Sequence, residues 1–571
     1  SSSVHRARQQ RIAVLTTTMD FGRLFQFFYL QMLNYFGERP IVETPSGPVM
    51  GSLLKTVTNK DIFAFRSIPY AKPPIGSLRF QPPEPVQPWH DVLDASGVNP
   101  GCVRPALLPL EKVSGIENCL VLNVYTPLRP KRAQQAELPV LVFIHGGGFT
   151  SGSSETSIYH PGYFLEHPII LVTLNYRLGA FGFLSTEDGV APGNNGLRDQ
   201  ILALKWVQNN IQAFGGDPTR VTLMGESAGG TSVHLLMMSP LARGLFSLAI
   251  SQSGSAFSPV LHYSKAIASR TKSLSEILKC PTNSSQIMLE CLRHAKPKKI
   301  LSGMKKLYEW GIFPFLFTPR IDTEASEPVI PREPLEMYKR GEVSNITWIC
   351  GVNQDEGIFW NANKLVADSQ LVQATPQMFS QISNIITGMV YINQSVDFSL
   401  LQKRYFKSNR MWKNSREFDE YIGDSFFVTG INYAQKMHSQ VADTYAYLFS
   451  YKGRYSLAGL YSFPFNGRGV SHGDELIYQF GPNYLITGIT PQDPDFPMVK
   501  AITHIWYSFI SQGKPYIKGK EFWPKFDKEN KSYLDLGSEL TVRKAYKEEL
   551  LGIWQDTIGL PPAYETINKT V

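Results

Sequence analysis

The stretch Val221–Gly230 reads VTLMGESAGG, in which an apolar run meets the pattern Gly-x-Ser-x-Gly. A serine on a sharp strand-to-helix turn presents its hydroxyl group, and small flanking residues leave room for that turn. Gly225 and Gly229 supply the room, and the helix-like run Thr231–Met238 follows. A glycine-rich structural turn would show the same pattern. We therefore predict a strand, a tight turn and a helix here, with Ser227 as a candidate nucleophile.

A second glycine-rich motif follows an earlier apolar run. Pro139–Thr150 reads PVLVFIHGGGFT, so a predicted strand ends in a histidine and three successive glycines. Glycines let backbone N–H groups come close to a substrate oxygen, and this motif is the expected oxyanion partner of a serine on a strand-to-helix turn. We expect the N–H groups of Gly147, Gly148 and Ala228 to form that oxyanion hole.

A serine nucleophile also needs a carboxylate that orients its base. In α/β-hydrolases this carboxylate follows the serine along the chain. Thr347–Phe359 reads TWICGVNQDEGIF, an apolar strand followed by two neighbouring acids. These residues alone leave Asp355 and Glu356 as equal candidates.

The base must be a histidine that takes the serine proton and passes it to the leaving group. Gly469–Glu475 reads GVSHGDE, which puts His472 in a glycine-flanked loop. His438 and His504 lie in helix-like surroundings, and we expect them to be structural. His472 is therefore the candidate base.

Apolar runs of strand length alternate with helical stretches along the chain. Runs that are apolar throughout indicate parallel strands covered on both faces. Their alternation with helices such as Leu197–Phe214 favours an α/β architecture with a large, mostly parallel central sheet. The predicted strands are Pro139–Ile144, Pro168–Asn175, Val221–Met224, Ser247–Ile250, Thr347–Val352 and Thr444–Phe449.

The folded region is expected to begin near Ile41, where IVETPSGPVMGSL predicts a hairpin that turns at Ser46-Gly47. Residues 1–40 are expected to be a leader, either a weak signal peptide or a non-native segment. Residues 41–571 are predicted to form a single domain.

Two regions of this domain look helical and irregular, Ser273–Pro334 and Pro376–Met437. We expect them to be insertions above the sheet, and we expect the last helix at Val542–Trp554. No segment reaches the 18 consecutive apolar residues of a membrane span, so no transmembrane segment is predicted.

The composition excludes several classes of protein. Of the 571 residues 43% are hydrophobic and 18% are charged, which excludes a disordered chain. The net charge of +8 is mild for this length. The densest basic run is Lys296–Lys299, followed by Lys305-Lys306, and no nucleic-acid-binding motif accompanies it. We interpret this run as a solvated surface and expect no nucleic-acid partner.

The five cysteines and the glycosylation motifs point to one compartment. Separations of 17 and 11 residues suggest two local pairs, Cys102–Cys119 and Cys280–Cys291, with Cys350 left over. Together with the sequons, these pairs favour the secretory pathway and a secreted glycoprotein. The Asn-x-Ser/Thr sequons are at Asn283, Asn345, Asn393, Asn530 and Asn568.

Taken together, these motifs resemble the type-B carboxylesterase/cholinesterase family over roughly Ile41 to Trp554. The resemblance is specific because several motifs recur in the same order. They are Phe65–Ala71, Leu78–Phe80, Glu117–Val124, His145–Phe149, Asn194–Gln200, Phe214–Pro218, Gly225–Gly229, Asn353–Gly357 and His472–Glu475.

The resemblance implies the α/β-hydrolase fold and a catalytic triad. The family's glutamate aligns with Glu356 and not with Asp355, so the triad would be Ser227, His472 and Glu356. The oxyanion donors implied by the family are the same three residues that the motifs suggest.

The resemblance also implies supporting features around the triad. It assigns the disulfides Cys102–Cys119 and Cys280–Cys291, in agreement with the spacing. It implies that the Ser253 hydroxyl supports the histidine and the acid, and that Glu226 is a buried carboxylate beside the nucleophile.

Some features depart from family patterns. The short loop between Cys102 and Cys119 lacks the choline-binding tryptophan of cholinesterases. Ile116-Glu117-Asn118 replaces the Ser-Glu-Asp that often precedes the second cysteine, which affects support of the site and not the triad. Juvenile hormone esterases typically carry Gln before the nucleophile, where this chain has Glu226. That difference favours a general carboxylesterase over a hormone-specific one.

We therefore expect a serine carboxylesterase that hydrolyses small-molecule carboxylic esters through an acyl-enzyme, without a metal or an organic cofactor. One alternative is an esterase specific for a lipid hormone or pheromone ester such as juvenile hormone. Another is a non-catalytic adhesion member of the family, which the intact triad disfavours. Candidates for lining an apolar pocket, with core packing as the alternative, are Phe149, Phe317, Phe359 and Trp360.

Overall fold

The computed structural model describes most of the chain. The described residues are 39–98, 100–105, 114–133, 136–258, 267–308, 315–360, 399–406, 415–461, 469–481, 488–517, 523–558, 561 and 563–565. The expected leader lies outside them except for its last two residues. The boundary at residue 40 and the single domain over residues 41–571 therefore stay predictions.

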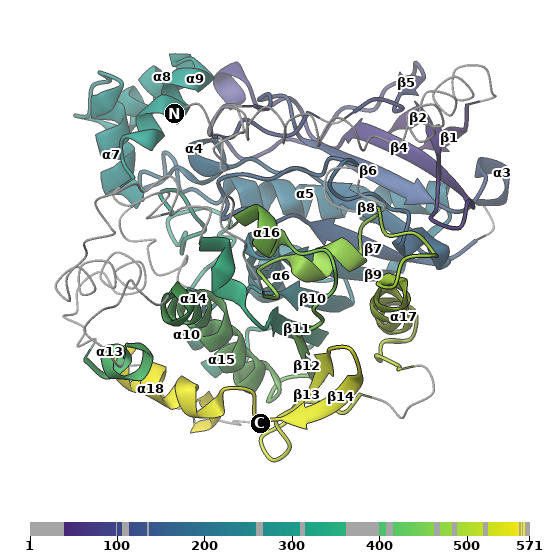
Figure 1. Cartoon of the computed structure of the whole chain (residues 1–571). Coiled ribbons are helices and arrows are strands. Elements are labelled where there is room, and N and C mark those ends of the chain that lie inside the picture. The colour runs from purple at the N-terminus through teal and green to yellow at the C-terminus, as the bar shows by residue number, and fades with distance from the viewer. Residues whose placement is uncertain are drawn as a thin grey trace, which may run out of the picture.

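A twisted sheet of eleven described strands runs through the molecule in the order β14-β13-β12-β11-β10-β9-β7-β8-β6-β4-β3 (Figure 1). Neighbouring strands are parallel from β8 to β13 and antiparallel toward both edges. The strands are β3 (Ser52–Lys55), β4 (Asp61–Pro69), β6 (Val121–Thr126), β7 (Leu138–Ile144), β8 (Ile170–Leu174), β9 (Gly216–Glu226), β10 (Leu248–Gln252), β11 (Thr347–Asn353), β12 (Thr444–Phe449), β13 (Ser532–Leu536) and β14 (Leu540–Lys544). All six strands predicted from apolar runs are present.

The sheet is covered on both faces, as the apolar runs predicted. Side chains of β7 alternate between two hydrophobic cores, so that Val142 joins one and Phe143 joins the other. Helices on opposite sides of the sheet complete these cores (Figure 1). The first core includes residues of α5 (Asn195–Asn210), α6 (Ala228–Met238) and α15 (Thr429–His438), and the second includes residues of α17 (Phe496–Gln512).

Two boundaries predicted from the sequence are wrong by one or a few residues. The hairpin of β1 (Ile41–Thr44) and β2 (Gly47–Met50) turns at residues 45–46, one residue earlier than expected. Thr44 holds the turn in this place, because its Oγ1 accepts hydrogen bonds from the backbone N–H groups of Ser46 and Gly47. The predicted helix Leu197–Phe214 ends as α5 at Asn210 and continues as a 3₁₀ turn to Phe214.

The predicted last helix, Val542–Trp554, is wrong in its first half. Its first residues belong to β14, which pairs antiparallel with β13 so that Val542 faces Leu534. The helix α18 runs from Glu548 to Ile558. The strand β13 offers these residues hydrogen-bonding partners, which the prediction from local sequence did not take into account.

The first predicted insertion, Ser273–Pro334, contains helical structure that packs on the first core. Its helices contribute buried residues such as Leu289 and Met304 to that core. They are α7 (Ile267–Ile277), α8 (Ser285–His294) and α9 (Pro297–Lys305), and α10 (Pro334–Lys339) follows.

The second predicted insertion, Pro376–Met437, lies partly outside the described residues. Its described part holds α13 (Ser399–Tyr405), α14 (Ser415–Gly423), a π-helical turn over Asp424–Val428, and most of α15.

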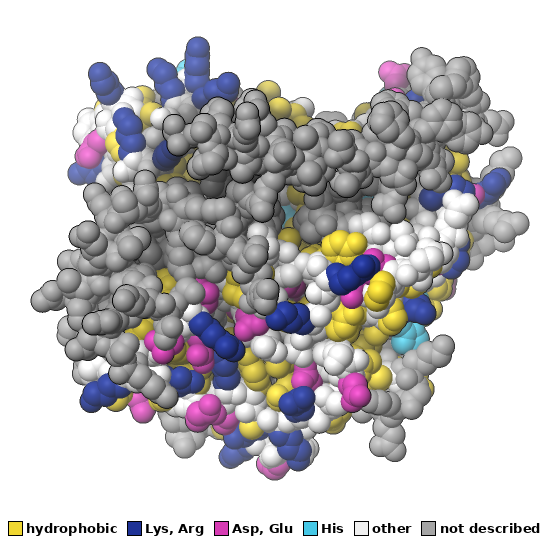
Figure 2. All heavy atoms as spheres, in the orientation of Figure 1, with side chains coloured by type: hydrophobic (Ala, Val, Ile, Leu, Met, Phe, Trp, Pro, Cys, Tyr) yellow, Lys and Arg dark blue, Asp and Glu magenta, His cyan; other side chains and the backbone are white. Residues whose placement is uncertain are grey.

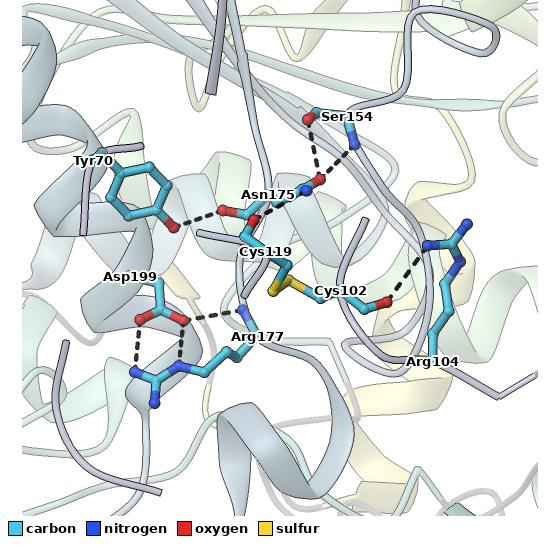
Figure 3. Close-up of a disulfide and its surroundings, with 8 residues drawn as sticks. All are labelled: Tyr70, Cys102, Arg104, Cys119, Ser154, Asn175, Arg177 and Asp199. Atoms are coloured by element: carbon cyan, nitrogen blue, oxygen red, sulfur yellow. Dashed lines mark hydrogen bonds and ion pairs between the residues drawn. A yellow bond between two sulfur atoms is a disulfide. The ribbon is translucent and has the colours of Figure 1, made fainter. Parts of the chain in front are cut away.

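The structure contains both disulfides expected from the sequence, Cys102–Cys119 and Cys280–Cys291. The first is tied to the sheet through Asn175, which directly follows β8 (Figure 3). Asn175 Nδ2 donates to the backbone carbonyl of Cys119 at 3.1 Å, and the Ser154 N–H donates to Asn175 Oδ1 at 2.9 Å. The loop that this disulfide closes is therefore fixed at one end of the sheet.

Among the described residues no helix is long and apolar enough to cross a membrane. The remaining cysteine, Cys350, is buried in β11 as a free thiol, and burial raises its pKa well above the usual value.

A buried hydrogen-bond chain joins three helices beneath the sheet. The Ala256 N–H donates to His234 Nδ1, so His234 donates from Nε2 to the Tyr338 hydroxyl at 2.8 Å. Tyr338 donates in turn to His438 Nδ1 at 3.2 Å, and His438 Nε2 donates to the carbonyl of Ile346 at 2.8 Å. Both histidines must stay neutral in this chain, and burial lowers the pKa of His438 to about 4.

This buried hydrogen-bond chain predicts that the contribution of His438 to stability depends on pH. Unfolded histidine binds a proton below about pH 6.5 while folded His438 does not, so stability is lost as the pH falls from about 6.5 toward 4. His438→Gln should be less stable than the parent protein at pH 7.5. The difference in unfolding free energy between the parent protein and His438→Gln should be about 3 kcal/mol smaller at pH 4.5 than at pH 7.5, measured by denaturant unfolding.

The control for this experiment is His294→Gln, since His294 is exposed at the end of α8. Its effect should be small at both pH values. A pH-independent difference between the parent protein and His438→Gln would contradict the neutral hydrogen-bond chain.

Candidate active site

A strained turn carries Ser227 between β9, which ends at Glu226, and α6, which begins at Ala228. Ser227 has φ 57° and ψ −122°, a conformation that costs a non-glycine residue about 1–3 kcal/mol. Two backbone hydrogen bonds hold it: the Ser227 N–H donates to the Gln252 carbonyl at 2.7 Å, and the Thr231 N–H donates to the Ser227 carbonyl at 2.9 Å. The turn is the strand-to-helix geometry that the sequence predicted.

Glycines around this turn are required by close backbone packing. A Cβ atom at Gly225 would lie 2.4 Å from the carbonyl carbon of Gly229, and one at Gly229 would lie 2.0 Å from the Ile144 carbonyl oxygen. A Cβ atom at Gly254 would lie 2.0 Å from the carbonyl oxygen of Ser227. The turn therefore fits only because three neighbouring positions lack side chains.

The three glycines after β7 lie against the same turn. Gly147 has φ +106° and Gly148 has φ +59°, which are backbone conformations that residues with a side chain rarely adopt. A Cβ atom at Gly146 would lie 2.9 Å from Ser227 Cβ, so this loop and the Ser227 turn are in contact. Among the described residues no acceptor takes a hydrogen bond from the N–H of Gly147 or Gly148. Both donors are therefore available to a ligand beside Ser227.

Glu356 is held at the end of β11 by three donors. Its Oε1 accepts from Ser253 Oγ at 2.5 Å and from the Asn353 N–H at 2.7 Å, and its Oε2 lies 2.6 Å from His472 Nδ1. Asp355 instead accepts from the Val470 N–H at 3.0 Å. Of the two acids that the local pattern left open, Glu356, which the family resemblance favoured, contacts the histidine, and Asp355 holds the backbone of the histidine loop.

His472 lies between two carboxylates. While Nδ1 faces Glu356, Nε2 lies 3.1 Å from Glu226 Oε1. The imidazole ring stacks on Phe427 at 4.2 Å between centroids, and the Phe359 ring is 5.3 Å away. The ring is thus oriented by charge at both nitrogens and by aromatic packing on its face.

The electrostatics of this group are dominated by burial and by the two acids. Burial raises the pKa of Glu226 to about 7, although the neighbouring His472 opposes this. Burial alone would lower the pKa of His472, but Glu226 and Glu356 outweigh it and raise that pKa to about 9. The arrangement therefore stabilises a proton on His472.

The sequence did not single out three residues that hold or contact the histidine loop, namely Asn353, Glu475 and Phe427. Asn353 Nδ2 donates to the Ser471 carbonyl at 2.8 Å and to Glu475 Oε2, and it thereby ties β11 to the histidine loop. Burial raises the pKa of Glu475 well above its usual value. Asn353 and Glu475 lie inside quoted motifs and could have been found there. Phe427 lies in the π-helical turn and had no sequence signal.

The two histidines that the sequence set aside, His438 and His504, lie outside this cluster. His438 belongs to the buried hydrogen-bond chain described above. His504 is on α17, across the sheet, with its ring 6.1 Å from that of His167.

Of the proposed pocket aromatics, Phe149 and Phe317 are fully buried in the first core, and Phe359 contacts His472. The Trp360 side chain lies outside the described residues.

Comparison with known proteins shows that the chain belongs to the carboxylesterase family, whose model matches residues 38–554. Esterase FE4 of Myzus persicae is 37% identical over 516 residues, which cover 88% of this chain and 89% of the relative. Juvenile hormone esterase of Tribolium castaneum is 36% identical over 513 residues, 85% of this chain and 86% of the relative. Liver carboxylesterase 1F of Rattus norvegicus is 31% identical over 548 residues, 91% and 94% respectively.

A solved structure agrees with these relatives. The crystal structure of juvenile hormone esterase from Manduca sexta, with OTFP covalently attached, matches with a TM-score of 0.78 and 29% identity. The match covers 91% of this chain and 100% of that chain. The protein is thus a carboxylic ester hydrolase with the α/β-hydrolase fold, as the sequence indicated.

The close packing of the turn predicts that adding a single methyl group at Gly229 lowers the stability of the protein. Gly229→Ala would place its Cβ 2.0 Å from the Ile144 carbonyl oxygen, so β7 and α6 would have to separate. We expect a loss of about 3 kcal/mol of stability, measured by thermal unfolding. The control is Gly552→Ala at an exposed position of α18, where nothing lies within 4 Å and a gain of up to about 1 kcal/mol is expected. A Gly229→Ala protein as stable as its parent would contradict this packing.

Proposed function

We propose that this carboxylesterase cleaves its ester through an acyl-enzyme on Ser227, with His472 as general base and Glu356 as the residue that orients it. The observation that carries the proposal is the 2.6 Å contact between Glu356 Oε2 and His472 Nδ1 beside a strained, glycine-packed serine turn. That contact fixes the proton of a neutral imidazole on Nδ1 and leaves Nε2 to accept the serine proton.

In the first half-reaction Ser227 Oγ attacks the ester carbonyl carbon while His472 Nε2 takes the hydroxyl proton. The N–H groups of Gly147, Gly148 and Ala228 stabilise the negative oxygen of the tetrahedral intermediate. The bond to the alcohol oxygen then breaks, His472 gives its proton to that oxygen, and the acyl group stays on Ser227. Water repeats the sequence in the second half-reaction and releases the acid.

Glu226 and Ser253 act through the triad and not on the ester. The Glu226 carboxylate lies on the Nε2 side of His472, where its charge stabilises the imidazolium that forms during each half-reaction. The Ser253 hydroxyl donates a hydrogen bond to Glu356 Oε1, which stabilises the carboxylate and holds its plane.

Juvenile hormone or another lipid-hormone ester is a second candidate substrate. It is supported by the similarity to the juvenile hormone esterases of Tribolium castaneum and Manduca sexta. Glu226 before the nucleophile supports the general esterase instead. A comparison of kcat/KM for a juvenile hormone ester and for short nitrophenyl esters distinguishes the two.

We also propose that the enzyme is a secreted glycoprotein. The two disulfides support an oxidising compartment, and the sequons at Asn283, Asn345 and Asn530 are exposed. The other two sequons, Asn393 and Asn568, lie outside the described residues.

The acyl-enzyme predicts a specific loss of turnover. Ser227→Ala should lower kcat on a short nitrophenyl ester by roughly 10⁶-fold, and Glu356→Gln by roughly 10⁴-fold. An organophosphate should block the parent enzyme at one equivalent and should not react with Ser227→Ala. The matched control is Ser302→Ala, which changes an exposed serine in α9 and should keep full activity. Turnover that survives in Ser227→Ala would refute the proposal.

The two carboxylates around His472 predict a shift in the pH profile. His472 must be neutral to act as base, so its titration sets the acidic limb of kcat/KM. Glu226 raises the pKa of His472, and removing its charge should lower that pKa. In Glu226→Gln the acidic limb should therefore move to lower pH by about one unit. An acidic limb that stays in place or moves to higher pH would show that Glu226 does not act on His472.

A further inference from the structure

One corner of the molecule carries nearly all of the net charge. Residues 267–308 contain nine Lys and Arg but only two Glu, a net charge of +7, while the whole chain has +8. This segment forms α7, α8 and α9, which we call the basic corner. Figure 2 shows Lys and Arg side chains gathered over the basic corner, at the upper left of Figure 1. The rest of the chain is close to neutral.

The lysines of the basic corner are exposed and have no acidic partner among the residues that the structure describes. None of them forms an ion pair with a described residue, whereas lysines elsewhere often do, such as Lys55 with Asp61 and Lys72 with Glu84. Clustered like charges repel one another and lower stability, so a purely structural role does not account for them. The seven lysines are Lys272, Lys279, Lys296, Lys298, Lys299, Lys305 and Lys306.

The backbone beneath these lysines is held by a disulfide and by hydrogen bonds from Arg79. The disulfide Cys280–Cys291 joins the residues after α7 to α8. At the end of α8, Arg79 Nη1 donates to the carbonyls of Arg293 and Ala295, both at 2.6 Å. Arg79 also pairs with Glu117 at 2.6 Å, which anchors the corner to the body of the enzyme. A preorganised surface loses little conformational entropy when it binds a partner.

The chemistry of the basic corner selects one class of anionic partner. Surfaces that bind single-stranded nucleic acid interleave basic residues with exposed aromatic rings, and membrane-binding helices present an exposed apolar face. Within residues 267–308 the large exposed hydrophobic residue is Ile287, and the apolar residues Ile300 and Met304 of α9 are buried. A sulfated polysaccharide needs only a rigid array of cations, because its sulfates supply the opposite charge. The disulfide in the corner also suits an extracellular partner.

We propose that the basic corner is a docking surface for a linear sulfated polysaccharide, which would hold the enzyme at a cell surface or in an extracellular matrix. The surface is distinct from the residues assigned to ester hydrolysis.

The experiment compares two variants of equal net charge for binding to heparin, a sulfated polysaccharide. The corner variant carries Lys296→Gln, Lys298→Gln, Lys299→Gln, Lys305→Gln and Lys306→Gln. The control variant carries Lys205→Gln, Lys452→Gln, Lys500→Gln, Lys514→Gln and Lys544→Gln, all exposed and without ion pairs to described residues. Hydrolysis of a nitrophenyl ester should be unchanged in both, which shows that both are folded.

The parent enzyme and the control variant should bind heparin with similar affinity at 0.15 M salt, a concentration of about physiological ionic strength. The corner variant should bind at least about tenfold more weakly, and its slope of log Kd against log salt should fall by about one for each lysine removed. Heparin stripped of its sulfates should bind the parent enzyme more weakly than intact heparin.

Several outcomes would overturn the proposal. Equal losses of heparin affinity in the corner variant and the control variant would mean that binding depends only on the overall charge of the protein. Absence of binding by the parent enzyme at 0.15 M salt would exclude the surface altogether. Tighter binding to phosphatidylserine vesicles or to single-stranded DNA than to heparin would assign the corner to a membrane or to a nucleic acid, and equal binding of desulfated heparin would exclude sulfate recognition.

Discussion

The rest of the site depends on a backbone turn that is packed too closely for side chains. Ser227 adopts a positive φ because the Gln252 carbonyl and the helix α6 hold it on either side. The glycines around it allow β9, α6 and β7 to approach within backbone contact. That approach brings the loop after β7 against Ser227, so one steric constraint positions both the candidate nucleophile and the candidate oxyanion donors.

A second constraint is electrostatic. His472 is buried between Glu226 and Glu356, so each change of its charge is felt by two carboxylates in a region from which water is largely excluded. The hydrogen bonds to Glu356 keep that acid in place, and the stacked Phe427 ring keeps the imidazole in plane. The parallel sheet makes this possible because β9, β10 and β11 end at the same edge and deliver Ser227, Ser253 and Glu356 together.

Charge is distributed in two different ways in this enzyme. At the candidate active site the charged groups are few, buried and in contact with one another. At the basic corner seven lysines are exposed and form no ion pair with a described residue, on a backbone held by Arg79 and a disulfide. Buried charges act over short distances on one reaction, while exposed charges of one sign act on large polyanions. The separation allows the two surfaces to serve different partners.

The sequence by itself determined the parallel sheet, the Ser227 turn, the glycine loop and His472, because each depends on local pattern: apolar runs, glycine spacing and short motifs. The local pattern left Asp355 and Glu356 open, and the family resemblance favoured Glu356. The tertiary structure supplied the physical reason, since Glu356 contacts His472 while the adjacent Asp355 holds the backbone of the histidine loop. Only the tertiary structure decided the roles of Val542, which reads as helix but pairs with Leu534, and of Phe427, which stacks on a histidine 45 positions away in the chain. Contacts between distant segments carry no local signature, so the fold must exist before such roles can be assigned.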